Sequence, residues 1–592
     1  MSTTEPDVEQ RPTAEPTRPE ATVRALVAGC AIGIVLAAGN VYTALKTGFI
    51  DGMSIMAALL GFVIFSSVKK LARRRYGPLE NNITQTTAAS AAIMSFVVGL
   101  PGPVAALDMM GMVPPGWAMA VWGAATGLLG IAAAIVLRRK LIVEDALPFP
   151  TGRATAELID TIHSGREAAM RRAWLLAGTA AVAMAITWFR EGSPRFIPQA
   201  TPFGGAIAGV AVASLTIGMS WSPLLASVGA FIGPRGGVSV LLGGGIAWGV
   251  LAPRLLNAGI VREAGFGAFT AWLAWPALGL LAAGSFLPLL LDPGALRRSL
   301  RDLGALARGR AAGPPNAGLA AGAADRPVGS RLLGSLFLVS VVTLVLAGRI
   351  VFGISPAVTL IAVVLALVLT NVSARATGET DVAPIGPVGM LTQLAFAGAG
   401  AVGSMVTGWA SSGASAQASG TLYAFRTGER VGASTRAQVG AQLVGCLLGA
   451  AVVVPVYFLL VRSYGIGTEA LPVASAQSWK AMAEAVRGGT AALPPYAALA
   501  GGMGIATGVI LTLCARTRIG RFVPSPAAIG MGMLVPGSYS LAIFVGAMAV
   551  MIARRVRPGL NESVVLTVAA GGMAGESLMG VIAAALMAAG AL

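Results

Sequence analysis

The 592-residue chain has few of the residues on which soluble enzymes and disulfide-rich proteins depend. Only 11% of its residues are charged. Its three cysteines, Cys30, Cys446 and Cys514, stand singly in apolar runs without CxxC spacing, which argues against a disulfide framework or a zinc site. The single histidine, His163, cannot form a multi-imidazole metal site, and we expect it in a solvated loop beside Asp160 and Arg166.

Enzyme motifs are also missing. The chain has no HExxH, no Walker A string, no paired Asp-rich prenyl-diphosphate signature, and no serine or cysteine with a credible base. We therefore expect no enzyme activity, no cofactor and no bound metal. Without a P-loop, ATP does not drive this chain directly, so an ion gradient is the economical energy source for any uphill transport.

Apolar sequence is abundant instead. The residues are 55% hydrophobic with a mean hydropathy of +0.77, well above the range of soluble domains. Apolar runs of about 20 residues, enough to cross roughly 30 Å of hydrocarbon, recur from Val23 almost to the C-terminus. We expect an all-α polytopic membrane protein with about 14 to 16 transmembrane helices. Its 78 glycines predict close packing between helices, and the alternating segments of a transmembrane barrel are absent.

The net charge of +17 comes largely from basic clusters in short connections between spans. In the first half these clusters lie within residues 69–75, 138–140 and 297–310. This pattern follows the positive-inside rule, so it indicates orientation and not a nucleic-acid partner. We expect a multi-pass protein of the bacterial inner membrane with a cytoplasmic N-terminus, and the topology of the second half stays open.

A polar stretch rich in Arg, Gly, Ala and Pro divides the chain near its middle. We expect a disordered cytoplasmic tail (1–22), a first transmembrane half (23–291), a cytoplasmic linker (292–330) and a second transmembrane half (331–592). Many transporters are duplicated in this way, with broken helices at the substrate path. Interrupted segments occur in similar order in both halves: Asn40–Gly48, Glu80–Gln85 and Leu147–Gly165, then Thr377–Leu394, Ala414–Ser434 and Arg521–Gly532.

Two of these segments predict helix starts that could bind an anion. In "LPFPTGRATAELI" a loop feeds a helix beginning near Thr151, and "RFVPSPAAIGMG" repeats the arrangement. The exposed N–H groups and the dipole of such a helix end attract an anionic group such as a peptide carboxylate. Two ordinary loops with proline at helix starts are the alternative.

Few ionisable residues lie inside apolar runs, where each costs a few kcal/mol or more. Glu576 is surrounded by apolar sequence, which favours proton coupling or substrate contact, against a structural hydrogen bond to a neighbouring helix. Lys46 ends the first span and could either snorkel to the interface or bind substrate. Glu157 follows Arg153 by four residues, so the two can form a structural pair or a proton site.

Five segments resemble the oligopeptide transporter (OPT) family when taken together. They are "LENNITQTTAASAA" from Leu79, "LPFPTGRATAELIDTIHSG" from Leu147, "TGETDVAPIGPVGMLTQL" from Thr377, "SAQASGTLYAFRTGERVGASTRAQ" from Ser415 and "GGMAGESLMGVIAAAL" from Gly571. Where the family usually has D-L-K-T-G, this chain has Ala424-Phe425-Arg426-Thr427-Gly428, and it lacks the N-P-G string of the eukaryotic peptide-transporter branch. The bacterial and yellow-stripe-like side of the family is more similar.

The resemblance implies a proton-coupled importer of short peptides or peptide-like metal chelates, in a bundle of two related halves that works by alternating access. It implies that Lys46 and Arg426 bind carboxylates, that Glu157 or Glu576 takes an amine or the coupling proton, and that Glu80 caps a helix. The remaining expected substrate-binding residues are Asn40, Tyr42, Asn81, Asn82, Gln85, Gln393 and Gln417. An uncoupled channel or lipid-handling protein of the same fold is the alternative. The sequence leaves open whether the chain forms a homodimer.

Overall fold

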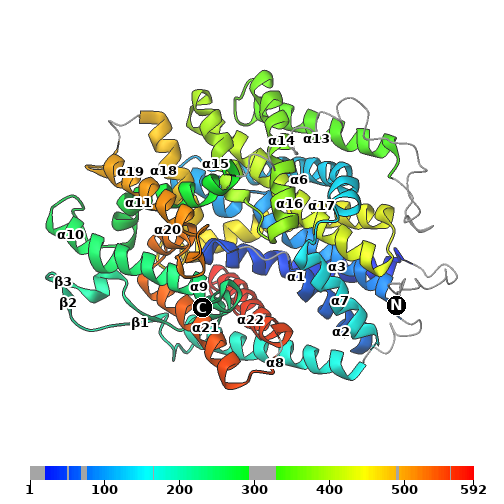
Figure 1. Ribbon diagram of the computed structural model, residues 1–592, viewed down its shortest axis with the longest axis horizontal. Helices are drawn as coiled ribbons and strands as arrows, with labels where there is room; N and C mark the ends of the chain where they lie inside the picture. Colours follow the sequence, from blue (N-terminus) through cyan, green and yellow to red (C-terminus); the bar gives the residue numbers. More distant parts are fainter. Residues whose placement is uncertain are drawn as a thin grey trace, which may run out of the picture.

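The computed structural model describes residues 20–49, 53–67, 76–164, 166–291, 328–488, 493–560 and 562–592. Helices make up almost all of the described structure, as Figure 1 shows. The exceptions are two short antiparallel ribbons, one pairing β1 with β4 and the other β2 with β3. Most of the expected N-terminal tail and central linker, and the basic clusters at 69–75 and 297–310, lie outside the described residues. The proposed division into halves stays a prediction.

The elements before the linker run in this order: α1 (Val23–Thr47), α2 (Ser54–Ser67), α3 (Pro78–Ala92), α4 (Met94–Val97), η2 (Leu100–Val104), α5 (Ala105–Met109), α6 (Gly116–Arg138), η3 (Arg139–Glu144), α7 (Pro150–Ser164), α8 (Arg166–Glu191), β1 (Ala200–Pro202), β2 (Ala206–Ile207), β3 (Val210–Ala211), η4 (Val212–Leu215), β4 (Gly218–Ser220), α9 (Pro223–Gly244), η5 (Gly245–Leu251), α10 (Ala252–Asn257) and α11 (Phe266–Leu290).

The elements after the linker are α13 (Ser330–Ile350), α14 (Pro356–Thr380), α15 (Ile385–Ala395), η6 (Ala397–Ala399), α16 (Gly400–Val431), α17 (Thr435–Tyr464), α18 (Ala474–Gly488), α19 (Ala497–Cys514), η8 (Gly520–Phe522), α20 (Pro526–Leu534), α21 (Gly537–Val556) and α22 (Glu562–Ala588).

Within the described residues, 12 helical segments are long and apolar enough to cross a membrane, or 13 if a bent pair counts as one span. The bent pair is α15 with α16, whose axes differ by 69°. The expected all-helical membrane protein with interrupted helices is therefore confirmed. The count is below 14 to 16 because some apolar runs form short helices, such as the 14-residue α2 and the nine-residue α20.

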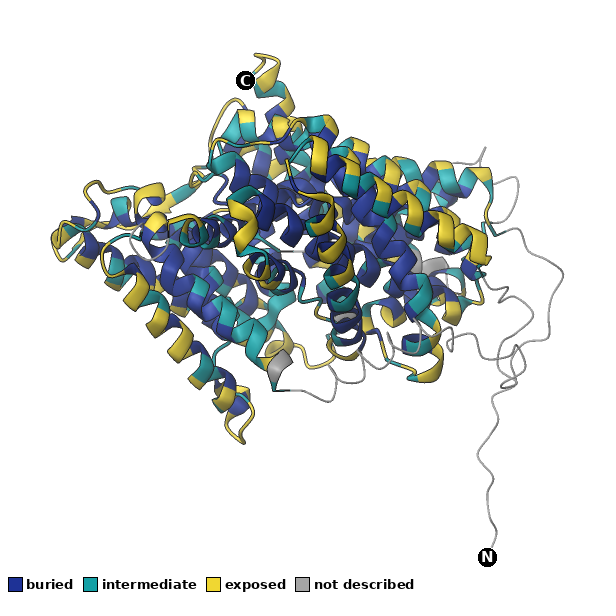
Figure 2. Ribbon diagram, turned by 90° about the horizontal axis from the view of Figure 1, so that it is seen from above, coloured by how far each residue is buried: buried dark blue, intermediate teal, exposed yellow. Residues whose placement is uncertain are grey.

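The segment from α3 to α5 is the buried centre of the bundle. Its most apolar stretch is buried throughout, whereas only 22% of the corresponding stretches of α8 and α19 is buried. Figure 2 shows the same distribution, with buried residues inside and exposed ones on the outer helices. Helix α3 packs on α1, α17, α2 and α16. The polar sequence that opens α3 therefore lies in the interior of the protein and not at its surface.

Breaks in helices follow glycine and proline. Gly102 has non-helical backbone angles directly before Pro103 in η2, and Gly233 with φ 71° precedes Pro234 in α9. Proline removes a helical hydrogen bond and glycine tolerates the left-handed conformation, which together allow a sharp bend. The predicted helix start near Thr151 is found at Pro150. The expectation for His163 was wrong, because it lies in the last turn of α7 and not in a loop.

Helices α9 and α21 pack through glycine, as expected for helices that associate in lipid. A Cβ atom added at Gly229 would clash with the carbonyl oxygen of Ile543, and one added at Gly546 would clash with that of Ala226. The backbones of the two helices therefore approach each other so closely that only glycine fits at these two positions.

We expect Gly546→Ala to destabilise the protein by about 1–3 kcal/mol, because the added methyl forces the two helices apart. Thermal unfolding of the detergent-purified protein would show a lower Tm. The matched control is Gly249→Ala in η5, where an added Cβ has no atom within 4 Å. Equal Tm values for the two variants would contradict glycine-dependent packing at this contact.

Candidate functional site

Four ionisable side chains from three helices meet in the interior: Lys46 of α1, Arg190 and Glu191 of α8, and Glu576 of α22. We refer to them as the charge cluster. Each is at most 5% exposed. Nζ of Lys46 lies 3.1 Å from Oε1 of Glu576, and Nη2 of Arg190 lies 2.7 Å from the same oxygen and 2.7 Å from Oε1 of Glu191. The two positive and two negative charges cancel.

The carboxylate of Glu576 also occupies the N-terminus of α9. The hydroxyl of Ser222, the N-cap residue, donates to Glu576 at 2.7 Å, and the backbone N–H of Leu224 donates at 2.9 Å. Free N–H groups and the helix dipole make this end of α9 favourable for a negative charge. Glu576 thus joins α22 to α1, α8 and α9 at one point.

Two tyrosines complete the cluster. Tyr42 lies one helical turn before Lys46, donates to Glu191 at 3.2 Å and accepts a hydrogen bond from Nζ of Lys46 at 2.7 Å. Tyr464, at the end of α17, donates to the other oxygen of Glu191 at 2.6 Å. Buried charges are tolerated when they are paired and hydrogen-bonded, and this arrangement meets both conditions.

Glu576, Lys46 and Tyr42 were expected among the functional residues from the sequence, whereas their partners Arg190 and Glu191 were not. Arg190 and Glu191 follow the apolar run Ala173–Phe189 directly, so they resemble the polar end of a span. The sequence does contain one signal. Arg190 and Glu191 have opposite charges and stand side by side at the end of the apolar run, as expected for two buried charges that neutralise each other.

The amides at the start of α3 are fully buried. Nδ2 of Asn81 lies 3.2 Å from Nε2 of His163, while both polar atoms of Asn82 and Nε2 of Gln85 have no hydrogen-bond partner within the described part of the chain. Glu80 does more than cap the helix, since it forms an ion pair with Arg24 at 2.6 Å. Buried amide atoms without partners are costly, which marks this face of α3 as unusual.

The other expected substrate-binding residues lie at helix contacts. Asn40 donates from Nδ2 to the carbonyl of Ala92 at 2.9 Å, and Gln393 donates to the carbonyl of Trp479 at 3.2 Å. Gln417 donates to Ser90 and Gln442, both at 3.1 Å. Arg426 pairs with Glu429 at 2.8 Å.

Glu157 lies apart from the charge cluster. Its side chain is 62% exposed and pairs only with Arg153, at 3.1 Å on the same face of α7, within the described structure. The structure therefore does not bring together Glu157 and Glu576, the two candidates for binding an amine or the coupling proton.

The two predicted anion-binding helix starts are satisfied by the chain itself. Both carboxylate oxygens of Asp381 bind at the start of α7, one accepting from the backbone N–H of Thr151 at 3.0 Å and the other from its hydroxyl at 2.7 Å. At α20 the N-cap Ser525 accepts from the N–H of Ala528. The prediction of an anion at Thr151 is correct in chemistry, but the anion is an aspartate of this protein.

A cavity of about 200 Å³ lies where broken helices meet. Its walls come from the end of α1, from η2, from α11, from the first turns of α15 and α18, and from α16 and α20. The interrupted segments Thr377–Leu394 and Arg521–Gly532 both contribute residues to its wall. Asn81, Asn82 and Gln85, which were expected to face a central cavity, are not among its described lining residues.

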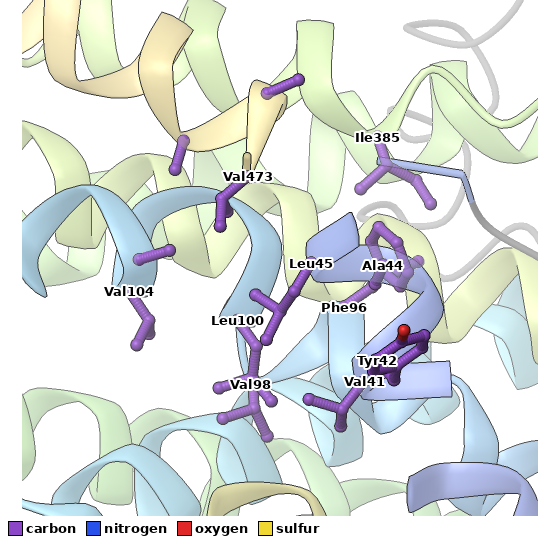
Figure 3. Packing of buried hydrophobic residues seen from close by; sticks show 14 of the residues in the cluster. Val41, Tyr42, Ala44, Leu45, Phe96, Val98, Leu100, Val104, Ile385 and Val473 are labelled. Carbon is purple, nitrogen blue, oxygen red and sulfur yellow. The ribbon is translucent and has the colours of Figure 1, made fainter. Parts of the chain in front are cut away.

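The end of α1 connects the cavity to the charge cluster. Gly48 lines the cavity two residues after Lys46, and the carbonyl of Leu45 accepts from the N–H of Val473 at 3.0 Å, directly before α18. Figure 3 shows the apolar packing there, with Leu45 of α1 near Leu100 of η2. A movement of this turn of α1 would displace residues of both the cavity wall and the charge cluster.

A helical protein with many spans, a cavity between broken helices and a balanced buried charge cluster belongs to the class of membrane transport proteins. More particularly, it belongs to the oligopeptide transporter family, because the family model described as OPT oligopeptide transporter protein matches residues 20–587. Members of this family are transporters, so the expectation that the chain is not an enzyme is confirmed.

Three relatives illustrate the family. YGL114W of Saccharomyces cerevisiae, named for oligopeptide transport, is 24% identical over 96% of both chains. The iron-phytosiderophore transporter yellow stripe 1 of Zea mays is 24% identical over 95% of this chain and 89% of its own length. The metal-nicotianamine transporter YSL2 of Arabidopsis thaliana is 22% identical over 95% of this chain and 92% of its own length.

We expect Lys46→Met to cost about 3–5 kcal/mol of stability, because it leaves the charge cluster with an uncompensated negative charge. Glu576→Gln should have a comparable effect with the opposite sign of residual charge. The double variant restores neutrality, so it should lose less stability than the sum of the single variants. Thermal unfolding of the four proteins measures this difference, and strictly additive losses would contradict the pairing.

Proposed function

We propose that this protein is a proton-coupled importer of short peptides or peptide-like metal chelates in the bacterial inner membrane. Membership of the oligopeptide transporter family supports the substrate class, since relatives are named for oligopeptides, iron-phytosiderophore and metal-nicotianamine. The positive-inside pattern supports a cytoplasmic N-terminus. Two transmembrane halves would move against each other in alternating access.

The observation that carries the coupling proposal is the neutrality of the charge cluster. Its four ionisable groups are all buried, so any change of net charge is costly there. A proton added to Glu576 leaves a net positive charge and weakens the attraction that holds Lys46 and Arg190. Proton binding would thereby favour separation of α22 from α1 and α8, which is a movement that can open a path.

In this proposal the cavity holds the solute and the last turn of α1 transmits the movement. Gly48 lines the cavity while Lys46, two residues earlier, is held in the cluster. Lys46 therefore acts in coupling and not, as expected from the sequence, as a direct ligand of substrate carboxylates. Glu157 has no place in the proposed coupling site because it is exposed and distant from the cluster's contacts.

In this proposal the buried amides bind solute in the other conformation of the alternating-access cycle. Asn82 and Gln85 have amide atoms without partners in the described structure, so a conformation that supplies substrate or water to them gains free energy. They would hydrogen-bond a peptide backbone or a chelate without the desolvation cost of a charged side chain.

Uptake by the purified protein in liposomes tests the proposal. Labelled di- to hexapeptides would be compared with ferric and nickel complexes of nicotianamine, with and without an inward proton gradient. Accumulation of one class only when the gradient is present supports the proposal. Transport of neither class, or downhill flux that ignores the gradient, would contradict it, the second result favouring an uncoupled channel of the same fold.

Glu576→Gln should abolish gradient-driven accumulation while solute exchange across the liposome membrane persists, because a glutamine cannot bind and release the coupling proton. The control is Glu157→Gln, which removes an exposed carboxylate outside the cluster and should accumulate solute like the unmodified protein. Comparable accumulation in the two variants would remove Glu576 from the coupling site.

A further inference from the structure

Residues at the starts of two helices line the cavity. Ile385, Gly386 and Pro387 of the first turn of α15 line the cavity, as do Ser475 and Ser478 of α18. The residue before α15 is Pro384, which provides no side-chain cap. The N–H groups of a first helical turn have no acceptor within their own helix, and each helix dipole places roughly half a positive charge at this end.

Ser478 supplies the second observation. Its side chain is fully buried, it lines the cavity, and its hydroxyl has no hydrogen-bond partner within the described residues. A buried hydroxyl without a partner costs free energy unless a ligand or water supplies one. The hydroxyl and the two helix ends thus converge on one small volume.

The same protein binds carboxylates in this way at two other helix starts. At α9 a serine hydroxyl and a backbone N–H hold Glu576, and at α7 a threonine hydroxyl and a backbone N–H hold Asp381. In each case a hydroxyl and the N–H groups of the first turn act together. At α15 the N–H groups of Ile385 and Val388 already donate to backbone carbonyls, and at α18 those of Ala476 and Gln477 do the same. The N–H groups that remain at the cavity wall are those of Gly386 and Ser475, beside the hydroxyl of Ser478. No carboxylate of the described chain lines the cavity.

The rest of the wall is apolar except for Ser285 and Ser412. Phe96, Phe286, Met390, Trp479 and Met531 line it, and none of its described lining residues is charged. An ammonium group would find no counter-charge there, whereas two helix N-termini together approach one positive charge. The cavity therefore favours a group that is anionic at one end and apolar or aromatic beside it.

We propose that the first turns of α15 and α18, with the hydroxyl of Ser478, form the site that holds a carboxylate of the transported solute, and that the aromatic and methionine wall holds its neighbouring apolar side chain. This assignment rests on the proposed transport function and specifies its recognition chemistry. It replaces a lysine or arginine as the carboxylate ligand with neutral hydroxyl and backbone groups.

Equilibrium binding to the full-length protein in lipid nanodiscs tests the site. The probe is the labelled tripeptide Ala-Phe-Ala, compared with its C-terminal amide and its N-acetyl derivative. Ser478→Ala should weaken binding of the free acid on the order of tenfold, the effect of losing one hydrogen bond to a charged group. The C-terminal amide should bind the unmodified protein about as weakly as the free acid binds Ser478→Ala. Its affinity should fall little further in that variant. N-acetylation should leave the affinity of the free acid nearly unchanged.

Ser411→Ala is the matched control. Ser411 is also fully buried with an unpartnered hydroxyl in the described structure, but it does not line the cavity. Its substitution should leave binding unchanged, and neither variant should lower the Tm. Equal binding of acid and amide, equal effects of the two serine substitutions, or no binding of any probe would overturn the assignment.

Transport in liposomes is measured separately with the same variants. If the protein accumulates peptide or chelate and Ser478→Ala accumulates it with unchanged affinity, the carboxylate site is wrong and the transport function stands. If acid binding depends on Ser478 but nothing crosses the membrane, the site is supported and the transport function fails.

Discussion

The structure depends on keeping buried charge neutral. In a medium that solvates ions poorly, a lone ammonium or carboxylate is costly, so each must be matched where it lies. Lys46, Arg190, Glu191 and Glu576 meet this condition together and not as two independent pairs, because Oε1 of Glu576 contacts both cations. Four elements, α1, α8, α9 and α22, are consequently fixed to one point, and a change in the charge of any member loosens all of them.

A second constraint is that helix ends inside the protein need partners. The chain solves this with its own carboxylates at α7 and α9 and with a serine cap at α20. The binding of Asp381 at α7 also brings two of the family-like segments into contact. "TGETD" supplies the carboxylate and "LPFPTG" supplies the helix start, so the two segments form one structural joint between α14 and α7.

Much of the fold could be predicted from sequence, because span length and hydropathy follow directly from the thickness of the bilayer. The interior position of Glu576 and the helix start near Thr151 could be predicted for similar local reasons. The residues that pair with Glu576 and with this helix start could not be predicted. Arg190 and Glu191 resemble an ordinary span end, and Asp381 lies 230 residues from the helix it caps, so only tertiary structure brings these groups together.

The cavity shows the same limit and points to how the parts act together. Sequence predicted that broken helices would line it, but assigned its chemistry to the charged and amide side chains that are conspicuous in an apolar chain. Lys46 is instead held by acidic partners, and the cavity presents helix ends and serines. In the proposed mechanism, charge and solute therefore occupy separate sites that share the last turn of α1. Since Leu45 is hydrogen-bonded to Val473 ahead of α18, that turn cannot shift to relieve a charge imbalance without also displacing the start of α18. Coupling between the two sites then requires no direct contact between proton and solute.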